Sequence, residues 1–143
     1  MLSSKLFSWK KKKKNSTIFK NEELIQKLRF EGITDEKILS AIRTVPRELF
    51  TEKLNEAYEN KALSTDCSQT MTQPFCTAFM ISCLNLKNTD KILEIGTGVG
   101  WATAIISKLV NLLFLFVILS SVSLLISNFS YFLVSKPKWS TTS

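Results

Sequence analysis

Three glycines at alternating positions, Gly96, Gly98 and Gly100, most constrain what this chain can fold into. They follow "KILEI", a short apolar run typical of a buried strand, and precede "WATAIISKLV", which suits a helix. Glycine lets the backbone turn sharply and approach a ligand closely, and the N–H groups at a helix start favour a polar or anionic group. Residues 91–110 therefore predict strand, glycine loop and helix, which is half of a βαβ unit.

The glycine spacing differs from that of a dinucleotide-binding loop. Such a loop reads G-x-G-x-x-G, whereas this one reads G-x-G-x-G, with Trp101 where the last small residue would stand. Glu94 precedes Gly96 by two positions, and its carboxylate suits a cofactor that carries an ammonium group. The stretch "ILEIGTGVG" resembles the first motif of class I S-adenosylmethionine-dependent methyltransferases. The alternative is a strand–turn–helix whose glycines serve only the turn.

Two short amphipathic helices are predicted before this motif. In "NEELIQKLRF", Asn21 is the expected N-cap, acids occupy the first turn, and Gly32 ends the helix. In "TDEKILSAIRTV", Thr34 is the expected N-cap and Pro46 stops the helix and starts the next, "PRELF". The side chains expected to face inward in the second helix are Ile38, Leu39, Ile42 and Val45.

A third helix is predicted to begin at Pro74, after a polar loop rich in Ser and Thr. Its sequence "PFCTAFMISCLNL" places Phe75, Phe79 and Ser82 at spacings of four and three. Cys76 and Cys83 would share a helix face as small core residues. With Cys67 they make three cysteines without a CxxC pair, so neither a disulfide framework nor a zinc site is expected, and a reduced cytoplasmic setting fits.

Charge and composition exclude several classes of function. Residues 1–20 contain seven Lys and no acid, whereas residues 21–110 contain ten Lys or Arg and twelve Asp or Glu. The net charge of +7 therefore belongs to the ends of the chain, and no basic face for nucleic acid is expected on the body. The run Lys10–Lys14 is interpreted as part of a solvated, disordered extension over residues 1–20, with an electrostatic tether as the alternative. The chain contains no His, and no metal site is predicted.

Three blocks together resemble the protein-L-isoaspartate O-methyltransferase family. They are "LIQKLRFEGITDEKILSAIRTVPRELF", "QTMTQPFCTAFM" and "ILEIGTGVGWATAIIS", and they cover about residues 22–110 in the order and at the separations of that family's amino-terminal half. The resemblance implies an α/β, Rossmann-like fold with an N-terminal helical layer. It also implies methyl transfer from S-adenosyl-L-methionine to the α-carboxylate of isoaspartyl residues in damaged proteins. The ester then collapses to a succinimide, which reopens partly as normal aspartate.

The resemblance also implies roles for individual residues. Gly96, Thr97, Gly98 and Gly100 would form the cofactor loop, with Glu94 beneath it. The family carries a serine in a Q-T-x-S-Q-P block, and Thr72 stands at that position here. Its hydroxyl would bond the substrate carboxylate, and its extra methyl stiffens the rotamer. The alternative is that Thr72 only caps the helix that Pro74 begins.

The family pattern is expected to break after Val110. A second strand ending in an acid that binds the cofactor ribose should follow, yet no Asp or Glu occurs after Glu94. Residues 111–134 are uncharged. A frameshift or decayed gene is the favoured interpretation of residues 111–143, because the change falls within a crossover unit; a transmembrane helix at 111–134 is the alternative.

The expected protein is therefore an incomplete methyltransferase, with residues 21–110 forming the N-terminal part of the catalytic domain. We expect a cytoplasmic monomer that is inactive as written, because one clear strand does not make a sheet. A membrane-anchored protein remains the alternative if the apolar segment is genuine.

Overall fold

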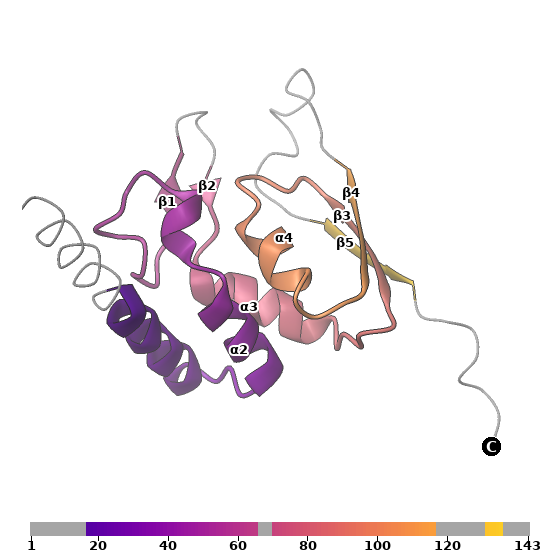
Figure 1. Cartoon of the computed structure of the whole chain (residues 1–143), viewed down its shortest axis with the longest axis horizontal. Coiled ribbons are helices and arrows are strands. Elements are labelled where there is room, and N and C mark those ends of the chain that lie inside the picture. Colours follow the sequence, from indigo (N-terminus) through magenta and orange to yellow (C-terminus); the bar gives the residue numbers. More distant parts are fainter. Residues whose placement is uncertain (1–16, 66–69, 117–130, 136–143) are drawn as a thin grey trace, which may run out of the picture.

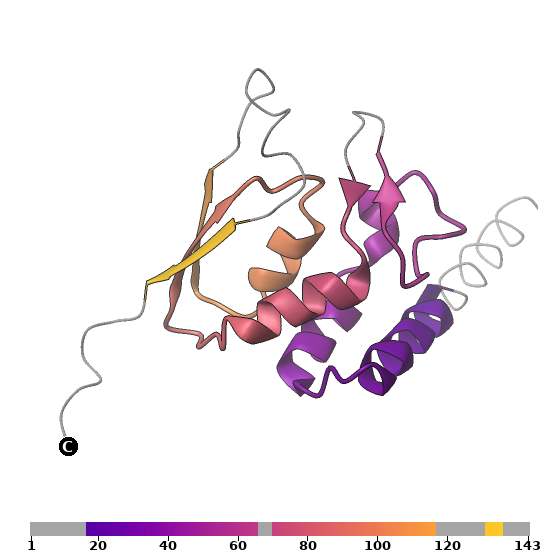
Figure 2. The ribbon, with the colours of Figure 1, turned by 180° about the vertical axis from the view of Figure 1, so that it is seen from behind.

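The computed structural model describes residues 17–65, 70–116 and 131–135. Its helices lie on one side of a three-stranded sheet, as both ribbon views show (Figure 1 and Figure 2). Two strands of two residues each, β1 (Leu63–Ser64) and β2 (Thr70–Met71), pair antiparallel and stand apart from that sheet. The lysine run Lys10–Lys14 and Cys67 lie outside the described residues.

The first helix includes residues 17–30. It ends as predicted at Gly32, whose φ of 105° is left-handed. Gly32 N–H donates to the carbonyl of Arg29 and Ile33 N–H to that of Leu28, both at 3.0 Å, which is the pattern of a Schellman motif. Residues 17–20, which the sequence placed in the extension 1–20, belong to this first helix.

The predicted N-cap role of Asn21 is wrong. Asn21 lies inside the helix and is buried, and its side-chain amide donates to the carbonyl of Arg43 at 2.9 Å. An Asn before two acids is a common cap signal, but here its amide donates to a backbone carbonyl near the C-terminal end of the second helix. That partner is 22 residues away along the chain, so the local sequence contained no sign of it.

Helix α2 (Glu36–Thr44) is capped by Asp35 and not by Thr34 as predicted. The Asp35 carboxylate accepts from Lys37 N–H at 2.8 Å and from Ile38 N–H at 3.4 Å, which satisfies N–H groups that a helix start leaves free. The predicted inward residues are all buried: Ile38, Leu39, Ile42 and Val45. Pro46 ends this segment as expected and precedes a 3₁₀ helix, η1 (Arg47–Phe50).

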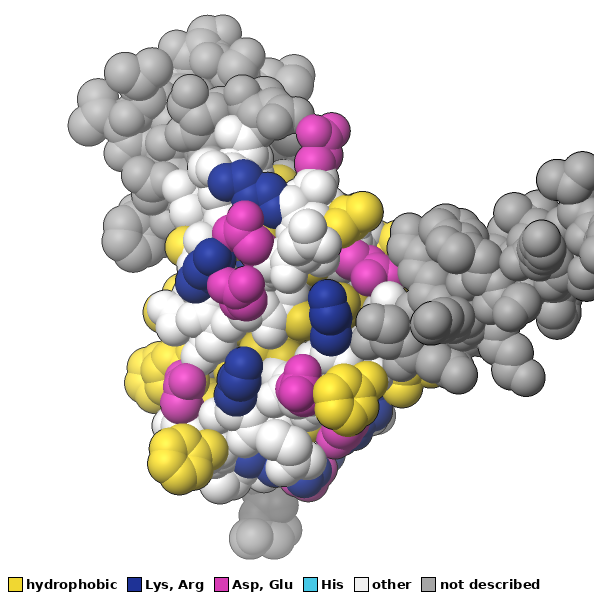
Figure 3. Space-filling model, turned by 90° about the vertical axis from the view of Figure 1, so that its left-hand side faces the viewer, with side chains coloured by type: hydrophobic (Ala, Val, Ile, Leu, Met, Phe, Trp, Pro, Cys, Tyr) yellow, Lys and Arg dark blue, Asp and Glu magenta, His cyan; other side chains and the backbone are white. Residues whose placement is uncertain are grey.

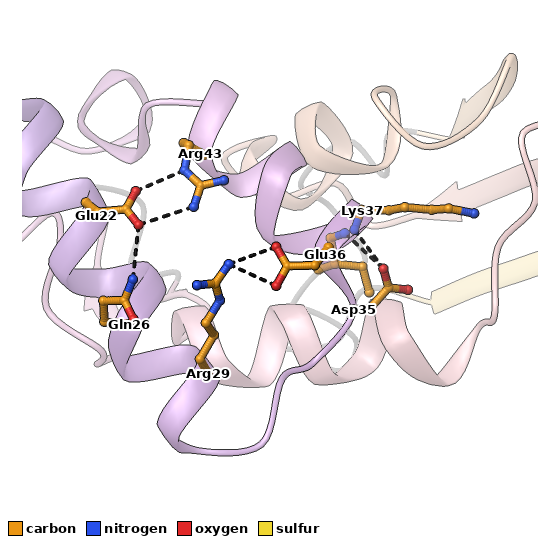
Figure 4. Close-up of polar contacts among 8 residues, drawn as sticks. Glu22, Gln26, Arg29, Asp35, Glu36, Lys37 and Arg43 are labelled. Atoms are coloured by element: carbon orange, nitrogen blue, oxygen red, sulfur yellow. Dashed lines mark hydrogen bonds and ion pairs between the residues drawn. The ribbon is translucent and has the colours of Figure 1, made fainter.

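Ion pairs join the first helix to α2 across their exposed side (Figure 4). Arg43 Nε lies 2.9 Å from Glu22 Oε2, and Arg29 Nη2 lies 2.8 Å from Glu36 Oε2. The hydrogen bond from Arg43 lowers the pKa of Glu22. Because these side chains are exposed, each pair contributes only about 0–1 kcal/mol, so the buried apolar residues hold the two helices together.

Helix α3 (Pro74–Cys83) begins at Pro74 as predicted. The buried residues are Pro74, Thr77, Ala78 and Ile81. Phe75 and Phe79 do share a face, with ring centroids 6.0 Å apart, yet Phe79 is 53% exposed. The helix is apolar around most of its circumference, so hydrophobic spacing alone could not select the inward side.

Cys76 and Cys83 are free and exposed on α3. Their predicted place in the core is therefore wrong. The small side chains that the core accepts from this helix are those of Thr77 and Ala78 instead.

The sheet contains more strands than the sequence indicated. Strand β3 (Lys91–Ile95) is followed by α4 (Trp101–Ile106) and then by β4 (Leu112–Phe116), which pairs parallel with β3 and completes a βαβ unit. Strand β5 (Tyr131–Ser135) pairs antiparallel on the other side, giving the order β4-β3-β5. The expectation of one clear strand is therefore wrong. The uncharged residues of β4 form a strand because they pair with the backbone of β3.

The segment 111–134, the alternative membrane helix, is extended at both described ends, at β4 and at β5. Within the described residues, no helix combines the length and the hydropathy that crossing a bilayer requires.

One hydrophobic core connects the helices to the sheet. Helix α2 packs against both α3 and α4. Along β3, Ile92 and Glu94 are buried whereas Leu93 and Ile95 are partly exposed, so the alternate side chains of this strand face the helices. The largest fully enclosed apolar side chains include Leu24, Leu28, Leu39, Ile42, Ile81, Ile92 and Ile105.

Candidate functional site

The glycine loop lies between β3 and α4, as predicted. Gly96, Gly98 and Gly100 have φ angles of 80°, 53° and 86°, all in the left-handed region that glycine adopts without a Cβ clash. Gly100 N–H donates to the carbonyl of Thr97 at 2.9 Å, which closes the turn before α4. The space beside Gly98 is open, so backbone conformation and not crowding requires glycine there.

Glu94 lies at the end of β3 with its side chain fully buried. Its Oε2 accepts a hydrogen bond of 2.5 Å from the hydroxyl of Thr103 on α4. Its Oε1 is also buried and has no hydrogen-bond partner. Burial raises the pKa of this carboxyl, and the bond from Thr103 opposes that rise. A buried carboxylate oxygen without a donor is costly to keep and is chemically suited to a cationic ligand.

Arg47 is a residue that sequence reasoning missed, and it is fully buried. Its guanidinium donates to four backbone carbonyls at 3.0–3.2 Å, those of Ala57, Glu59, Lys61 and Thr72. Burial lowers its pKa to about 10, so it remains charged at neutral pH. A planar guanidinium has five donors in fixed directions, which lets one side chain fasten several chain segments.

Arg47 and Trp101 together join the three sequence blocks. The Arg47 guanidinium lies 5.1 Å from the centre of the Trp101 ring, within range of a cation–π interaction. The indole N–H of Trp101 donates to the carbonyl of Val45 at 3.3 Å. The residue that replaces the last small residue of a dinucleotide loop is thus a buried anchor that connects the glycine loop to the helical layer.

Thr72 lies half-buried between β2 and α3. Its carbonyl accepts from Arg47 at 3.0 Å, so Arg47 connects the predicted catalytic position with the segment that begins at Trp101. The alternative role of Thr72 as a helix cap is not what the structure shows. Gln73 occupies the N-cap position and makes no side-chain cap bond.

The start of α3 is capped from a distance by Asn60, another residue that sequence reasoning missed. Asn60 Oδ1 accepts from Phe75 N–H at 2.9 Å, and its amide donates to both carboxylate oxygens of Glu31 at 2.7 Å. The Gln73 amide in turn donates to the carbonyl of Asn60 at 3.1 Å. The loop that contains Thr72 is therefore held on one side by Arg47 and on the other by Asn60.

An open groove of about 590 Å³ adjoins the glycine loop. Val99 lines it from that loop, and Leu49, Phe50 and the segment Ser64–Thr65 are among its other lining residues. Phe50 also lies 3.9 Å from where a Cβ on Gly100 would stand. Among the described residues, no group of three or more His, Cys, Asp or Glu is placed to hold a metal ion.

The chain matches the family model of protein-L-isoaspartate(D-aspartate) O-methyltransferase over residues 19–128, a range that runs past Val110 and includes β4. It is 46% identical over 93 residues to protein-L-isoaspartate O-methyltransferase of Dictyoglomus turgidum, covering 64% of this chain and 42% of the relative. It is 50% identical over 92 residues to that of Erwinia tasmaniensis, covering 63% and 44%. The chain thus spans less than half the length of these curated relatives.

Solved structures of the same kind share the fold. One protein-L-isoaspartate O-methyltransferase superposes with a TM-score of 0.58 at 28% identity, covering 68% of this chain and 33% of the other. A Plasmodium falciparum protein described as a β-aspartate methyltransferase, in complex with S-adenosyl-L-homocysteine, superposes with a TM-score of 0.56 at 21% identity, covering 61% and 40%. The family model matches residues 19–128, which is most of this chain, so the chain belongs to the protein-L-isoaspartate(D-aspartate) O-methyltransferase family.

Proposed function

We propose that this chain binds S-adenosyl-L-methionine at the glycine loop and is the cofactor-binding part of a methyltransferase that repairs isoaspartyl residues in proteins. The observation that carries the proposal is the family match over residues 19–128, which includes every residue assigned to the site. The relative in complex with S-adenosyl-L-homocysteine supports the choice of cofactor.

The residues present fit this cofactor. The buried Oε1 of Glu94 lacks a donor, and the ammonium of a methionine group would supply one. The left-handed glycines let the backbone of residues 96–100 approach the ligand without side chains in the way. When bound, S-adenosyl-L-methionine supplies a methyl group activated by a sulfonium. Arg47 and Trp101 hold the surrounding segments in place while the ligand is bound.

The proposed methyl acceptor is the α-carboxylate of an isoaspartyl residue in a damaged protein. Thr72 would donate its hydroxyl to this carboxylate and orient it, with its own backbone fixed by Arg47. The acceptor is already ionised at neutral pH, so positioning supplies much of the rate and no general base is required. A chain without His is compatible with such chemistry.

We further propose a cytoplasmic monomer that does not bind nucleic acid. Exposed free Cys76 and Cys83 support a reducing compartment. On the face shown in Figure 3, the Lys and Arg side chains of the described residues are interspersed with Asp and Glu, which supports the absence of a basic binding surface.

Isothermal titration of the purified 143-residue chain with S-adenosyl-L-homocysteine tests the proposal. We expect binding, and we expect Gly98→Ala to weaken it, because a Cβ at this left-handed position costs about 1–2 kcal/mol. The matched control is Gly32→Ala, a left-handed glycine at the far end of the first helix, which should leave the affinity unchanged. Failure of the wild-type chain to bind would overturn the cofactor assignment.

Methyl transfer to an isoaspartyl peptide is the second measurement. We expect the chain alone to show little turnover, because no Asp or Glu follows Glu94 to bind the cofactor ribose. Robust turnover would show that the described half of the fold suffices for catalysis, and would establish the repair reaction directly.

A further inference from the structure

Within the part of the chain that the structure describes, no cation is found to balance the charge of Glu94. Its backbone neighbours in the sheet are Leu115 on β4 and Phe132 on β5. The helices α3 and α4 carry no charged residue in their sequences, and Lys91 at the start of β3 is exposed. The described contact to the carboxylate is the hydroxyl of Thr103. A buried carboxylate with one hydroxyl donor and no counter-charge does not stabilise the fold. Its presence here indicates that it binds a ligand.

Thr103 makes the two oxygens of the Glu94 carboxylate inequivalent, because it bonds only one of them. Thr103 lies at the third position of α4, so its backbone is held by the helix, and its hydroxyl donates to Oε2 at 2.5 Å. With Oε2 engaged, the carboxyl group cannot rotate freely, and Oε1 keeps one direction. Oε1 is the oxygen that is buried without a donor.

We propose that Thr103 is a positioning residue: its hydroxyl holds Glu94 so that Oε1 accepts the ammonium group of the bound cofactor. The proposal rests on the cofactor assignment above. It adds a specificity element on α4, outside the glycine loop, that discriminates ligands by the presence of the ammonium group and not by the adenosine.

Three ligands separate this role from a general structural one. S-adenosyl-L-homocysteine has the ammonium and the carboxylate, its decarboxylated form keeps only the ammonium, and 5′-methylthioadenosine has neither. We expect Thr103→Val to weaken binding of the first two ligands about tenfold, since a misdirected charge-assisted hydrogen bond costs roughly 1.4 kcal/mol. Binding of 5′-methylthioadenosine should not change, and Thr103→Ser should restore the wild-type pattern.

The controls use the same chain. Thr44→Val removes a hydroxyl that bonds only within α2, to Ala41, and should affect none of the three affinities. In a Glu94→Gln background, Thr103→Val should no longer change the ratio of the affinity for S-adenosyl-L-homocysteine to that for 5′-methylthioadenosine. The charge that the Thr103 hydroxyl orients is absent there. Thr103→Ala repeats the comparison with a better helix former if the valine variant unfolds.

The outcomes are distinct. Equal affinities of wild type and Thr103→Val for S-adenosyl-L-homocysteine would overturn the positioning role while leaving the cofactor assignment intact. A parallel loss for all three ligands would also overturn it, in favour of a structural role. Absence of binding by the wild-type chain would remove the cofactor assignment and this inference together.

Discussion

Arg47 and Glu94 are both fully buried charged side chains, but their surroundings differ. Arg47 donates to four carbonyls and lies over the ring of Trp101, which compensates most of its lost hydration although its Nε has no partner. Glu94 has one hydroxyl donor and an unpaired oxygen. This difference supports a framework role for Arg47 and the proposed ligand-binding role for Glu94, because an uncompensated buried charge weakens the free protein and gains most from a counter-ion.

Replacing Glu94 by Gln is expected to stabilise the free chain at neutral pH. Burial raises the pKa of Glu94 above its ordinary 4.5, so the folded protein holds this proton more tightly than the unfolded chain does. The free energy of unfolding therefore falls as the pH rises from about that ordinary value through the raised pKa. Gln removes this loss and still offers Thr103 an acceptor.

Urea denaturation at several pH values measures this effect. The stability difference between Glu94→Gln and wild type should grow as the pH rises from about 4 to neutrality. A stability difference that stays constant with pH would contradict this prediction. So would a wild-type chain that is more stable than the Glu94→Gln variant at neutral pH. Glu23→Gln, an exposed change on the first helix, is the matched control.

Replacing Arg47 by Lys is expected to destabilise the chain by about 3 kcal/mol, because one ammonium cannot reach carbonyls in four directions and leaves buried acceptors unpaired. The exposed Arg29→Lys change should stay within about 0.5 kcal/mol. Urea denaturation followed by circular dichroism measures both. Equal effects of the two substitutions would show that the Arg47 contacts contribute little.

At the scale of elements, caps and turns explain where most helices begin and end. Asp35 caps α2, Gly32 closes the first helix, and Pro46 separates α2 from η1. These signals are local, so the sequence predicted them to within a residue or two. The start of α3 differs, because the group that satisfies its backbone comes from Asn60 in another segment.

Asn60→Ala is expected to destabilise the chain by about 1 kcal/mol, the usual loss when a cap is removed. Its effect should be largest at the start of α3, where Phe75 N–H loses its acceptor. Hydrogen exchange of peptides covering residues 73–80, compared with an exposed Asn55→Ala control, measures it. Unchanged exchange there would show that the N–H finds another acceptor.

At the scale of the whole molecule, β3 is the central strand and is bordered by β4 and β5. The amides of residues 91–95 should therefore exchange more slowly than those of the two-residue hairpin β1–β2, which has little backbone pairing to protect it. Hydrogen-exchange mass spectrometry of the intact chain tests this. Equal exchange in the two regions would show that the three-stranded pairing is only transient.

The charge-free stretch beyond Val110 gives a prediction about the gene. Strand β4 is formed, but neither it nor any later position supplies the acid that should bind the cofactor ribose. We expect a second reading frame across the codons for residues 105–143 to encode a strand ending in Asp or Glu. Resequencing and three-frame translation test this, and the absence of such a frame would identify the apolar stretch as genuine.

The sequence by itself determined several local features: "KILEI" as a strand, the glycine loop after it, the end of the first helix at Gly32 and the inward residues of α2. Each depends on neighbours within a few positions, where periodicity and φ preference act directly. Only the tertiary structure decided which face of α3 is buried, that β4 and β5 pair with β3, and which groups Arg47, Asn60 and Thr103 contact. Those features depend on partners far away in the chain or on packing, so no local pattern specifies them.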